Sequence, residues 1–221
     1  ERARGSHGGV PISSQTDRFD GWIAGLGAAS GLRVVVGHWP RSPLGPFTDV
    51  MVERPDGRRL LLAPSAEVSA YVTATYRFDE VVVTAVDVRI EDAGWRIAAG
   101  PLALEFGLGR RPALGMMLRA IPRPLATRVT WIRGAGVVAR RALPGVRTHG
   151  SAGGGRHEYY AALDLRRIVA ARVRWEGRDQ GPLAPVEPPV RFGFGSTPAE
   201  PSLVRMVTLV ERSADRRSRR A

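Results

Sequence analysis

The sequence predicts a mainly β protein of the α+β class, built as a β-barrel or a β-sandwich. About a dozen short segments are rich in β-branched residues or alternate between apolar and polar residues. Turn sequences such as Pro55-Asp56-Gly57 separate them, and the chain contains 26 Gly and 17 Pro. The segments between the strands are too short to hold the helices that a parallel α/β sheet requires.

The expected strands are those in which apolar side chains recur at every second position or form a short β-branched run. They cover residues 33–36, 47–54, 58–62, 80–91, 95–99, 102–106, 127–132, 137–141, 157–165, 168–175, 190–194 and 203–211.

Two helices are expected beside these strands. Ser65 is a typical N-cap residue, and the apolar positions that follow it repeat at helical spacing up to Thr75. The second helix is expected between Pro112 and Pro122. Its apolar positions are Leu114, Met117, Leu118 and Ile121. We expect this stripe to pack on the barrel; the alternative is a surface for a partner or a membrane, flanked by Arg110, Arg111 and Arg119.

The chain of 221 residues contains no lysine and no cysteine, so all 33 basic side chains are arginines. These absences exclude thiol nucleophiles, disulfides, cysteine-ligated metals and any Schiff base formed by a side-chain amine. The formal net charge is +12, but the arginines are spread along the chain and form no single stripe. We therefore expect no nucleic-acid partner.

The chain is expected to form one domain over residues 8–211, because no shift in composition marks an internal linker. Residues 1–7 resemble a cloning remnant, and residues 212–221 are expected to be a disordered basic tail. No apolar run reaches the roughly 18 residues of a membrane span. We expect a cytoplasmic protein that does not bind membranes, and homo-oligomers are compatible with the sequence.

Asp49 is the first candidate for chemistry. Strand alternation places its side chain on the same face as Phe47 and Met51, opposite Thr48 and Val50. A carboxylate between two apolar side chains has a raised pKa, as a general acid or base near neutral pH requires. The alternative is a strand end at which Asp49 faces water.

A glycine-rich segment at residues 145–160 is the second candidate. Arg147, His149, Arg156 and His157 lie there and lead into a strand that contains Tyr160. Such a loop can bind a carboxylate or a phosphate, or it can be a plain hairpin tip. The spacing of the two histidines defines no metal site. The segment is not a phosphate-binding loop of the Walker type either, because no Lys-Ser/Thr pair follows the glycines.

Phe192 and Phe194 alternate with glycines near the end of the chain. This pattern places both rings on one face of the strand expected there, where they can line a ligand pocket or pack in the barrel interior.

Residues 66–71, Ala-Glu-Val-Ser-Ala-Tyr, resemble a segment of the acetoacetate decarboxylase family that follows a glycine-rich turn and an acidic residue. The end of the chain is similar to that family too, in its Trp175-Glu176-Gly177 and in the proline-rich residues 181–190. The resemblance covers residues 42–210. It implies a closed, mostly antiparallel β-barrel with two or three short packed helices and an internal pocket. By this resemblance Asp49, Glu67 and Tyr71 match positions of the family motif.

The chain departs from the family at the lysine that forms the imine. That lysine follows the Ser-Ala-Tyr segment closely, whereas Thr73 and Ala74 occupy its neighbourhood in this sequence. The decarboxylase mechanism therefore cannot operate here. Glu67 is a candidate catalytic residue by resemblance, although a first-turn acid is also what the helix dipole favours.

Two functions remain open at this point. The first is a protein that binds a small oxo-acid or polyketide-like molecule, or an acid/base enzyme of the lyase or isomerase type, without metal or cofactor. Asp49, His149 and Glu67 are its candidate catalytic residues, and its acidic or lipophilic ligand would contact Arg147, Arg156, His157, Tyr71, Tyr160, Phe192 and Phe194. The second is a non-catalytic protein that holds acidic partners through its arginine-rich surface and tail.

Overall fold

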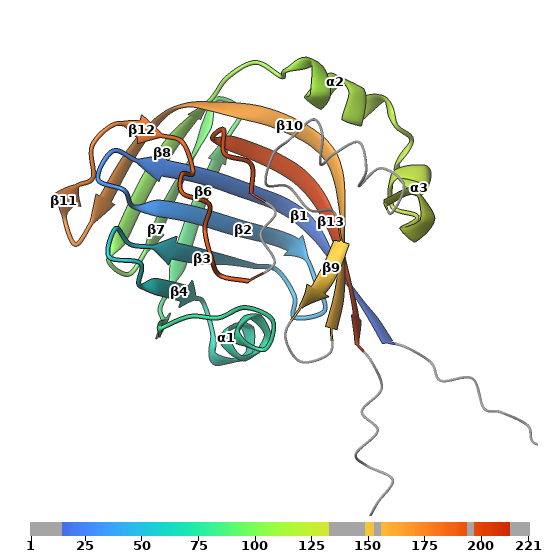
Figure 1. Ribbon diagram of the computed structural model, residues 1–221, viewed down its shortest axis with the longest axis horizontal. Coiled ribbons are helices and arrows are strands. Elements are labelled where there is room, and N and C mark those ends of the chain that lie inside the picture. Colours follow the sequence, from blue (N-terminus) through green and yellow to red (C-terminus); the bar gives the residue numbers. More distant parts are fainter. Residues whose placement is uncertain (1–14, 133–148, 153–155, 194–196, 213–221) are drawn as a thin grey trace, which may run out of the picture.

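One mixed β-sheet, curled into a half-barrel, forms the body of the protein in this computed structural model (Figure 1). The structure describes residues 15–132, 149–152, 156–193 and 197–212. Ten strands follow one another in the order β5-β4-β3-β2-β1-β13-β10-β8-β7-β6, and the short strands β9, β11 and β12 pair beside this path.

The strands are β1 (Gln15–Ala28), β2 (Arg33–Arg41), β3 (Phe47–Glu53), β4 (Arg59–Ala63), β5 (Glu80–Val83), β6 (Val86–Glu91), β7 (Gly94–Ala99), β8 (Leu102–Leu108), β9 (His149–Ala152), β10 (Arg156–Trp175), β11 (Arg178–Asp179), β12 (Leu183–Ala184) and β13 (Ser202–Arg212). The helices are α1 (Ala66–Thr73), α2 (Ala113–Ala120) and α3 (Arg123–Ala126).

The mainly β class, the few short helices and the mostly antiparallel pairing are confirmed, but the expectation of a closed barrel is wrong. The sheet is open, because β5 and β6 lie at its two ends and no ladder joins them in the described part of the chain. It is also mixed, since β4 and β5 are parallel. Helix α1 connects these two strands, and such a crossover returns the chain in the same direction.

Several strands differ from the expected ones. Strand β1 was not expected, because acidic residues and glycines interrupt its apolar pattern; it is held by long ladders to β2 and β13. Residues 80–91 form two strands, whereas residues 157–165 and 168–175 belong to the single strand β10. Residues 129–132 are helical, and residues 190–193 lie in a loop. The strand expected at 137–141, residues 1–14 and the tail beyond Arg212 lie outside the described residues.

Both helices begin where the sequence predicts. The Ser65 side chain accepts a hydrogen bond from the backbone N–H of Val68, and α2 starts directly after Pro112. Helix α2 contacts the sheet through Leu114 and Leu118. The expectation that Met117 packs on the barrel is wrong: Met116 and Met117 are each 65% exposed. Gly115 allows this helix to lie close to β10, because a Cβ at that position would collide with the backbone oxygen of Leu165.

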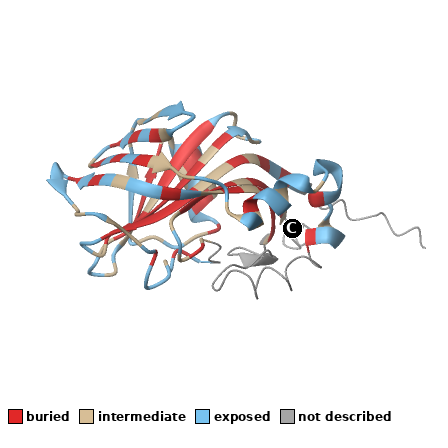
Figure 2. Cartoon of the chain, turned by 90° about the horizontal axis from the view of Figure 1, so that it is seen from above, coloured by how far each residue is buried: buried red, intermediate tan, exposed pale blue. Residues whose placement is uncertain are grey.

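The central strands are buried on both faces, and this double burial positions the site. On one face, Val34, Val36, Val50 and Val52 belong to the main core together with residues of β7 and β8 such as Ile97. On the other face, β1 to β3 pack against α1. In Figure 2 buried residues accordingly dominate the middle of the sheet, while the helices are largely exposed.

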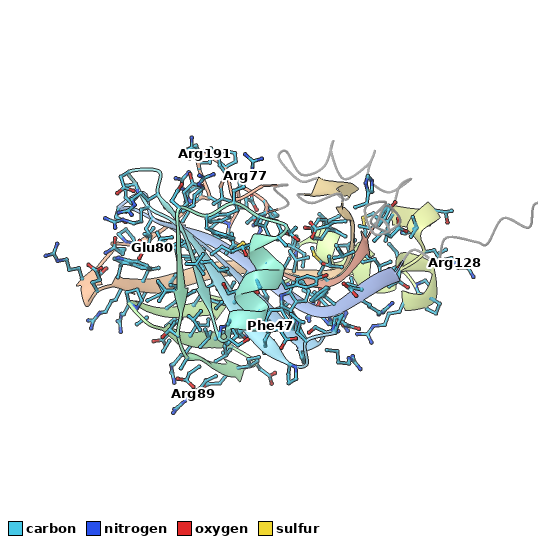
Figure 3. The ribbon with its side chains drawn as sticks, turned by 90° about the horizontal axis from the view of Figure 1, so that it is seen from below. Phe47, Arg77, Glu80, Arg89, Arg128 and Arg191 are labelled. Atoms are coloured by element: carbon cyan, nitrogen blue, oxygen red, sulfur yellow. The ribbon has the colours of Figure 1, made fainter. Side chains whose placement is uncertain are left out.

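Charged side chains are mostly dispersed over the surface, as Arg77, Arg89, Arg128 and Arg191 illustrate (Figure 3). A few charged side chains are buried, and Glu53 at the end of β3 is fully so. Its carboxylate lies 3.2 Å from the guanidinium of the buried Arg33 and 3.1 Å from that of Arg191, whose backbone N–H also donates to it over 2.7 Å. This cluster fastens the loop around Arg191 to the sheet.

We predict that Glu53→Gln destabilises the protein by about 3–5 kcal/mol, because the substitution leaves the buried Arg33 without its counter-charge. The control is Glu80→Gln, which removes an exposed carboxylate 3.6 Å from Arg58 and should cost less than about 1 kcal/mol. Urea unfolding followed by circular dichroism measures both. Equal effects of the two substitutions would contradict the structural role given to Glu53.

Candidate functional site

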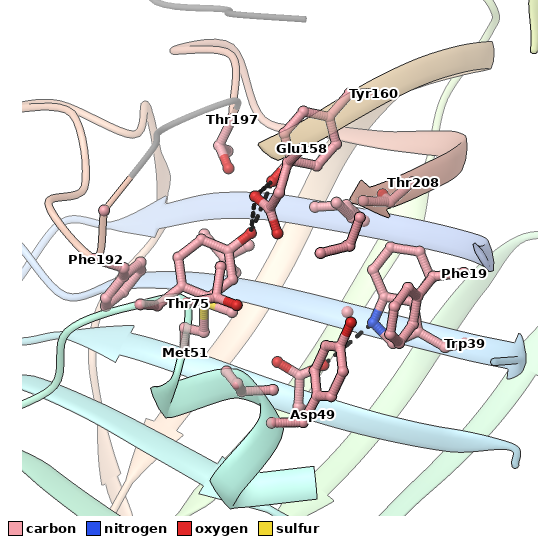
Figure 4. Close-up of a pocket in the computed structure, with 18 of the residues that line it drawn as sticks. Phe19, Trp39, Asp49, Met51, Thr75, Glu158, Tyr160, Phe192, Thr197 and Thr208 are labelled. Atoms are coloured by element: carbon pink, nitrogen blue, oxygen red, sulfur yellow. Dashed lines mark hydrogen bonds between the residues drawn. The ribbon is translucent and has the colours of Figure 1, made fainter. Parts of the chain in front are cut away.

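A cavity lies on the face of β1 to β3 that points away from β7 and β8. Its volume is about 90 Å³, which is room for a few water molecules or a small organic group. The walls come from β1, β2, β3, β10 and β13, from α1 with the residues after it, and from the loop residues 190, 192, 193 and 197 (Figure 4). The residues lining it are Phe19, Ile23, Val35, Gly37, Trp39, Phe47, Asp49, Met51, Tyr71, Val72, Thr75, Tyr76, Glu158, Tyr160, Val190, Phe192, Gly193, Thr197, Thr208 and Val210.

The loop over the cavity is held at several points. The backbone N–H of Arg77 donates to the carbonyl of Phe192 over 2.6 Å, and the ring of Phe192 packs against that of Phe78 with 5.6 Å between centroids. The residue before Phe192, Arg191, is held to the sheet by its ion pair with Glu53. The loop therefore forms a fixed wall of the cavity in this structure.

Asp49 is the acidic group at the floor of the cavity. Phe47, Asp49 and Met51 all line it, so the alternation of β3 sets this face as the sequence predicts. Asp49 is only 2% exposed. Its Oδ1 accepts a hydrogen bond of 3.3 Å from Nε1 of Trp39, while its Oδ2 has no partner in the described part of the chain.

Burial in this apolar surrounding raises the pKa of Asp49 to about 7, against the smaller opposing effect of the Trp39 hydrogen bond. Gly37 stands opposite Asp49 in the ladder of β2 and β3. A Cβ at Gly37 would lie 2.6 Å from Oδ1 of Asp49 and 2.7 Å from Nε1 of Trp39. Glycine is therefore required there for the carboxyl and the indole to meet.

A second polar group lies across the cavity from Asp49, on β10 (Figure 4). Tyr160 donates a hydrogen bond of 2.6 Å to Oε2 of Glu158, and Tyr76 donates one of 3.1 Å to the same oxygen. The two hydroxyl oxygens are 2.7 Å apart. Burial, reinforced by the neighbouring Glu158, holds the pKa of both tyrosines well above the usual value, so both are protonated at neutral pH.

Some of the residues predicted from the sequence line the cavity, and others do not. Asp49, Tyr71, Tyr160 and Phe192 line the cavity. Glu67 is exposed in the first turn of α1 and does not. The exposed Thr73 and Ala74 do not line it either, whereas the neighbouring Thr75 does. The place suggested for the missing lysine thus lies at the outer end of α1.

The glycine-rich segment contributes less than expected to the described cavity. His157 alternates with Glu158 on β10, and its ring packs against Tyr159, at 5.3 Å between centroids. His157 therefore lies on the other face of the sheet. Arg147 and Phe194 lie outside the described residues, as do the side chains of His149 and Arg156, although their backbones belong to β9 and β10.

Glu158, Tyr76 and Trp39 were not expected as site residues. Strand alternation could have paired Glu158 with Tyr160, since the two are separated by one residue on β10. No local pattern places Tyr76, which reaches the cavity from the turn after α1.

Two classes of site are not found within the described ranges. No group of three or more histidine, aspartate or glutamate side chains is placed to hold a metal ion. No described helix has the length and apolar character needed to cross a membrane.

Taken together, the described residues form a β half-barrel with one small aromatic cavity that contains two acidic groups. Among solved structures, the fold is similar to that of acetoacetate decarboxylase from Legionella pneumophila subsp. pneumophila str. Philadelphia 1, with a TM-score of 0.43, 10% identity, and coverage of 90% of this chain and 86% of that chain. A second acetoacetate decarboxylase structure gives a TM-score of 0.34, 10% identity, and coverage of 91% and 86%. No family model and no curated protein matches the sequence. The similarity concerns the fold and assigns no activity.

We predict that the pH dependence of stability differs between the wild type and Asp49→Asn. The folded pKa of Asp49, about 7, lies above the 3.8 of an aspartate in water, so between these values the folded state binds more protons than the unfolded state. Wild-type stability should therefore fall, relative to Asp49→Asn, as the pH rises from 4 to 8. The ceiling is roughly 4 kcal/mol, at about 1.36 kcal/mol per pKa unit.

The measurement is urea unfolding of both proteins at each pH. Asp79→Asn is the control with the opposite sign, because the hydrogen bond from Arg59 lowers the pKa of the exposed Asp79 to about 2. The stability that Asp79 contributes is present above about pH 4 and is lost on acidification. A wild type and Asp49→Asn that differ by the same amount at every pH would disprove the raised pKa of Asp49.

Proposed function

We propose that this protein binds a small, largely apolar molecule in the cavity and exchanges a proton with it through Asp49. The observation that carries the proposal is a buried carboxyl group, set in an aromatic pocket, with a pKa near neutrality and one oxygen that has no partner in the part of the chain that the structure describes. Groups with this combination act as general acids or bases, and a bound ligand can supply the hydrogen bond or the counter-charge that such an oxygen lacks.

The reaction class that fits is acid/base chemistry without an imine, such as enolisation, dehydration or a cyclisation. Asp49 supplies or accepts the proton, and the protonated hydroxyls of Tyr76 and Tyr160 lie across the cavity, held by Glu158. The sequence contains no lysine that could form a covalent intermediate. The lipophilic ligand among the initial expectations suits this lining better than the acidic one, which relied on Arg147 and Arg156.

A cavity-filling substitution tests the binding site. Cyclohexanone, a neutral ketone of suitable size, should bind the wild type and lose at least about tenfold in affinity in Val72→Phe, whose larger ring occupies the cavity and costs about 1–3 kcal/mol of stability. Val81→Phe is the matched control, because Val81 is exposed on the edge strand β5. Ligand-observed NMR measures the affinities, after thermal unfolding has shown that both variants are folded. Equal affinity of all three proteins would place the ligand elsewhere.

Proton exchange is tested by calorimetry of the same binding reaction in buffers of different ionisation enthalpy. Asp49 must be protonated to donate a hydrogen bond to the ketone oxygen, so binding at pH 8 should take up close to one proton. The uptake should vanish in Asp49→Asn. Proton uptake that persists in this variant would assign the titrating group to another residue.

The second candidate function, an interaction protein for acidic partners, is supported by the exposed side chains over α2 and α3. Met116, Met117, Leu125 and Trp131 are exposed there, beside Arg110 and Arg123. Thermal stabilisation by polyglutamate that disappears at high salt would favour this function, because salt screens exposed charges.

A further inference from the structure

The described walls of the cavity are acidic and aromatic, with no basic side chain among them. Asp49 and Glu158 are its ionisable carboxyl groups. Seven rings surround the space, from Phe19, Trp39, Phe47, Tyr71, Tyr76, Tyr160 and Phe192. A negatively charged ligand would thus lie close to Asp49, without an arginine or histidine among the described lining residues to balance its charge.

The two most buried carboxyl groups, those of Glu53 and Asp49, have different partners. Glu53 has two guanidinium groups within 3.2 Å, so its charge is balanced inside the protein. Asp49 has the Trp39 N–H at 3.3 Å, and its second oxygen has no described partner. An ionised Asp49 therefore lacks a counter-charge that the fold supplies elsewhere, and a bound cation would provide it.

The rings suit a cation as well. Phe19 lies at the centre of an aromatic cluster, with ring centroids 5.7 Å from Trp39, 6.3 Å from Phe47 and 5.2 Å from Tyr71. Aromatic faces attract ammonium groups, and the attraction is strongest where water is excluded. A methylated ammonium group donates few or no hydrogen bonds, so an apolar aromatic wall satisfies it.

We propose that the ligand of this cavity is an organic cation, an alkylated ammonium group bound among the aromatic rings with Asp49 as its counter-ion. The inference rests on the proposed function, because it presupposes that a small molecule binds here. It adds the charge of the ligand to the proposed function. The described walls favour a positive ligand whose surface is largely hydrocarbon.

Choline and 3,3-dimethylbutan-1-ol test this inference, because the two molecules have nearly the same shape and differ in the charge on the central atom. We expect the wild type to bind choline at least about tenfold more tightly than the alcohol, since desolvated cation–π contacts add to the ion pair. Asp49→Asn should reduce this preference strongly while leaving the affinity for the alcohol unchanged. Asp79→Asn, an exposed carboxyl outside the cavity, should leave both affinities unchanged.

The pH dependence gives an independent reading, because choline keeps its charge at every pH. The titratable side chains that face the cavity are Asp49, Glu158, Tyr71, Tyr76 and Tyr160. Choline affinity should increase from pH 5.5 to 8.5 as Asp49 loses its proton, whereas the affinity for the alcohol should not increase. Isothermal calorimetry measures both.

Equal or tighter binding of the alcohol would overturn the cationic ligand and leave the proposed function intact. Failure of choline to bind while cyclohexanone binds would do the same. Failure of choline, the alcohol and cyclohexanone alike would overturn both, since the cavity would then accept neither charged nor neutral molecules of this size.

Discussion

The burial of β1, β2 and β3 on both faces is the constraint on which the rest of the structure depends. Val50 and Val52 point into the core shared with β7 and β8, so the residues of β3 that alternate with them point to the other face, where α1 and the loop around Phe192 cover the sheet. Most side chains on that second face, such as Phe19 and Trp39, are buried. Asp49 is one of these residues, and its raised pKa follows directly from its place in the strand.

Glu53 and Asp49 differ in their partners, and this difference supports a structural role for Glu53 and the proposed functional role of Asp49. Both carboxyl groups belong to β3 and both are buried. Glu53 is paired with Arg33 and Arg191 and thereby ties the loop to the sheet. Asp49 accepts a hydrogen bond from the indole N–H of Trp39, and its second oxygen has no partner among the described residues. A buried acid that is costly to ionise and adds no structural contact of comparable strength is typical of a functional group.

The part of the site that depends on local pattern was predictable from the sequence. Alternation alone placed Asp49 between Phe47 and Met51, and Ser65 and Pro112 marked the starts of two helices. These features depend on neighbours within a few residues. The packing of Met117 was not predictable in this way, since α2 contacts the sheet with a narrower stripe, Leu114 and Leu118, than its apolar residues suggest.

Features that depend on distant partners could not be predicted. Strand β1 is stabilised by ladders to β2 and β13, the second of which is almost 200 residues away in the chain. The sheet is open because its two outer strands, β5 and β6, are not paired with each other in the described part of the chain. Tyr76 and Glu158 meet across 82 positions. No spacing within the sequence indicates such a pair.

The titration of the Asp49 carboxyl carbon, followed by 13C NMR in the ligand-free protein and assigned by the loss of its signal in Asp49→Asn, tests the central claim most directly. The account predicts a midpoint near pH 7. A midpoint near pH 4, the value of an aspartate in water, would show that the carboxyl group is solvated and that the cavity is not the apolar site described.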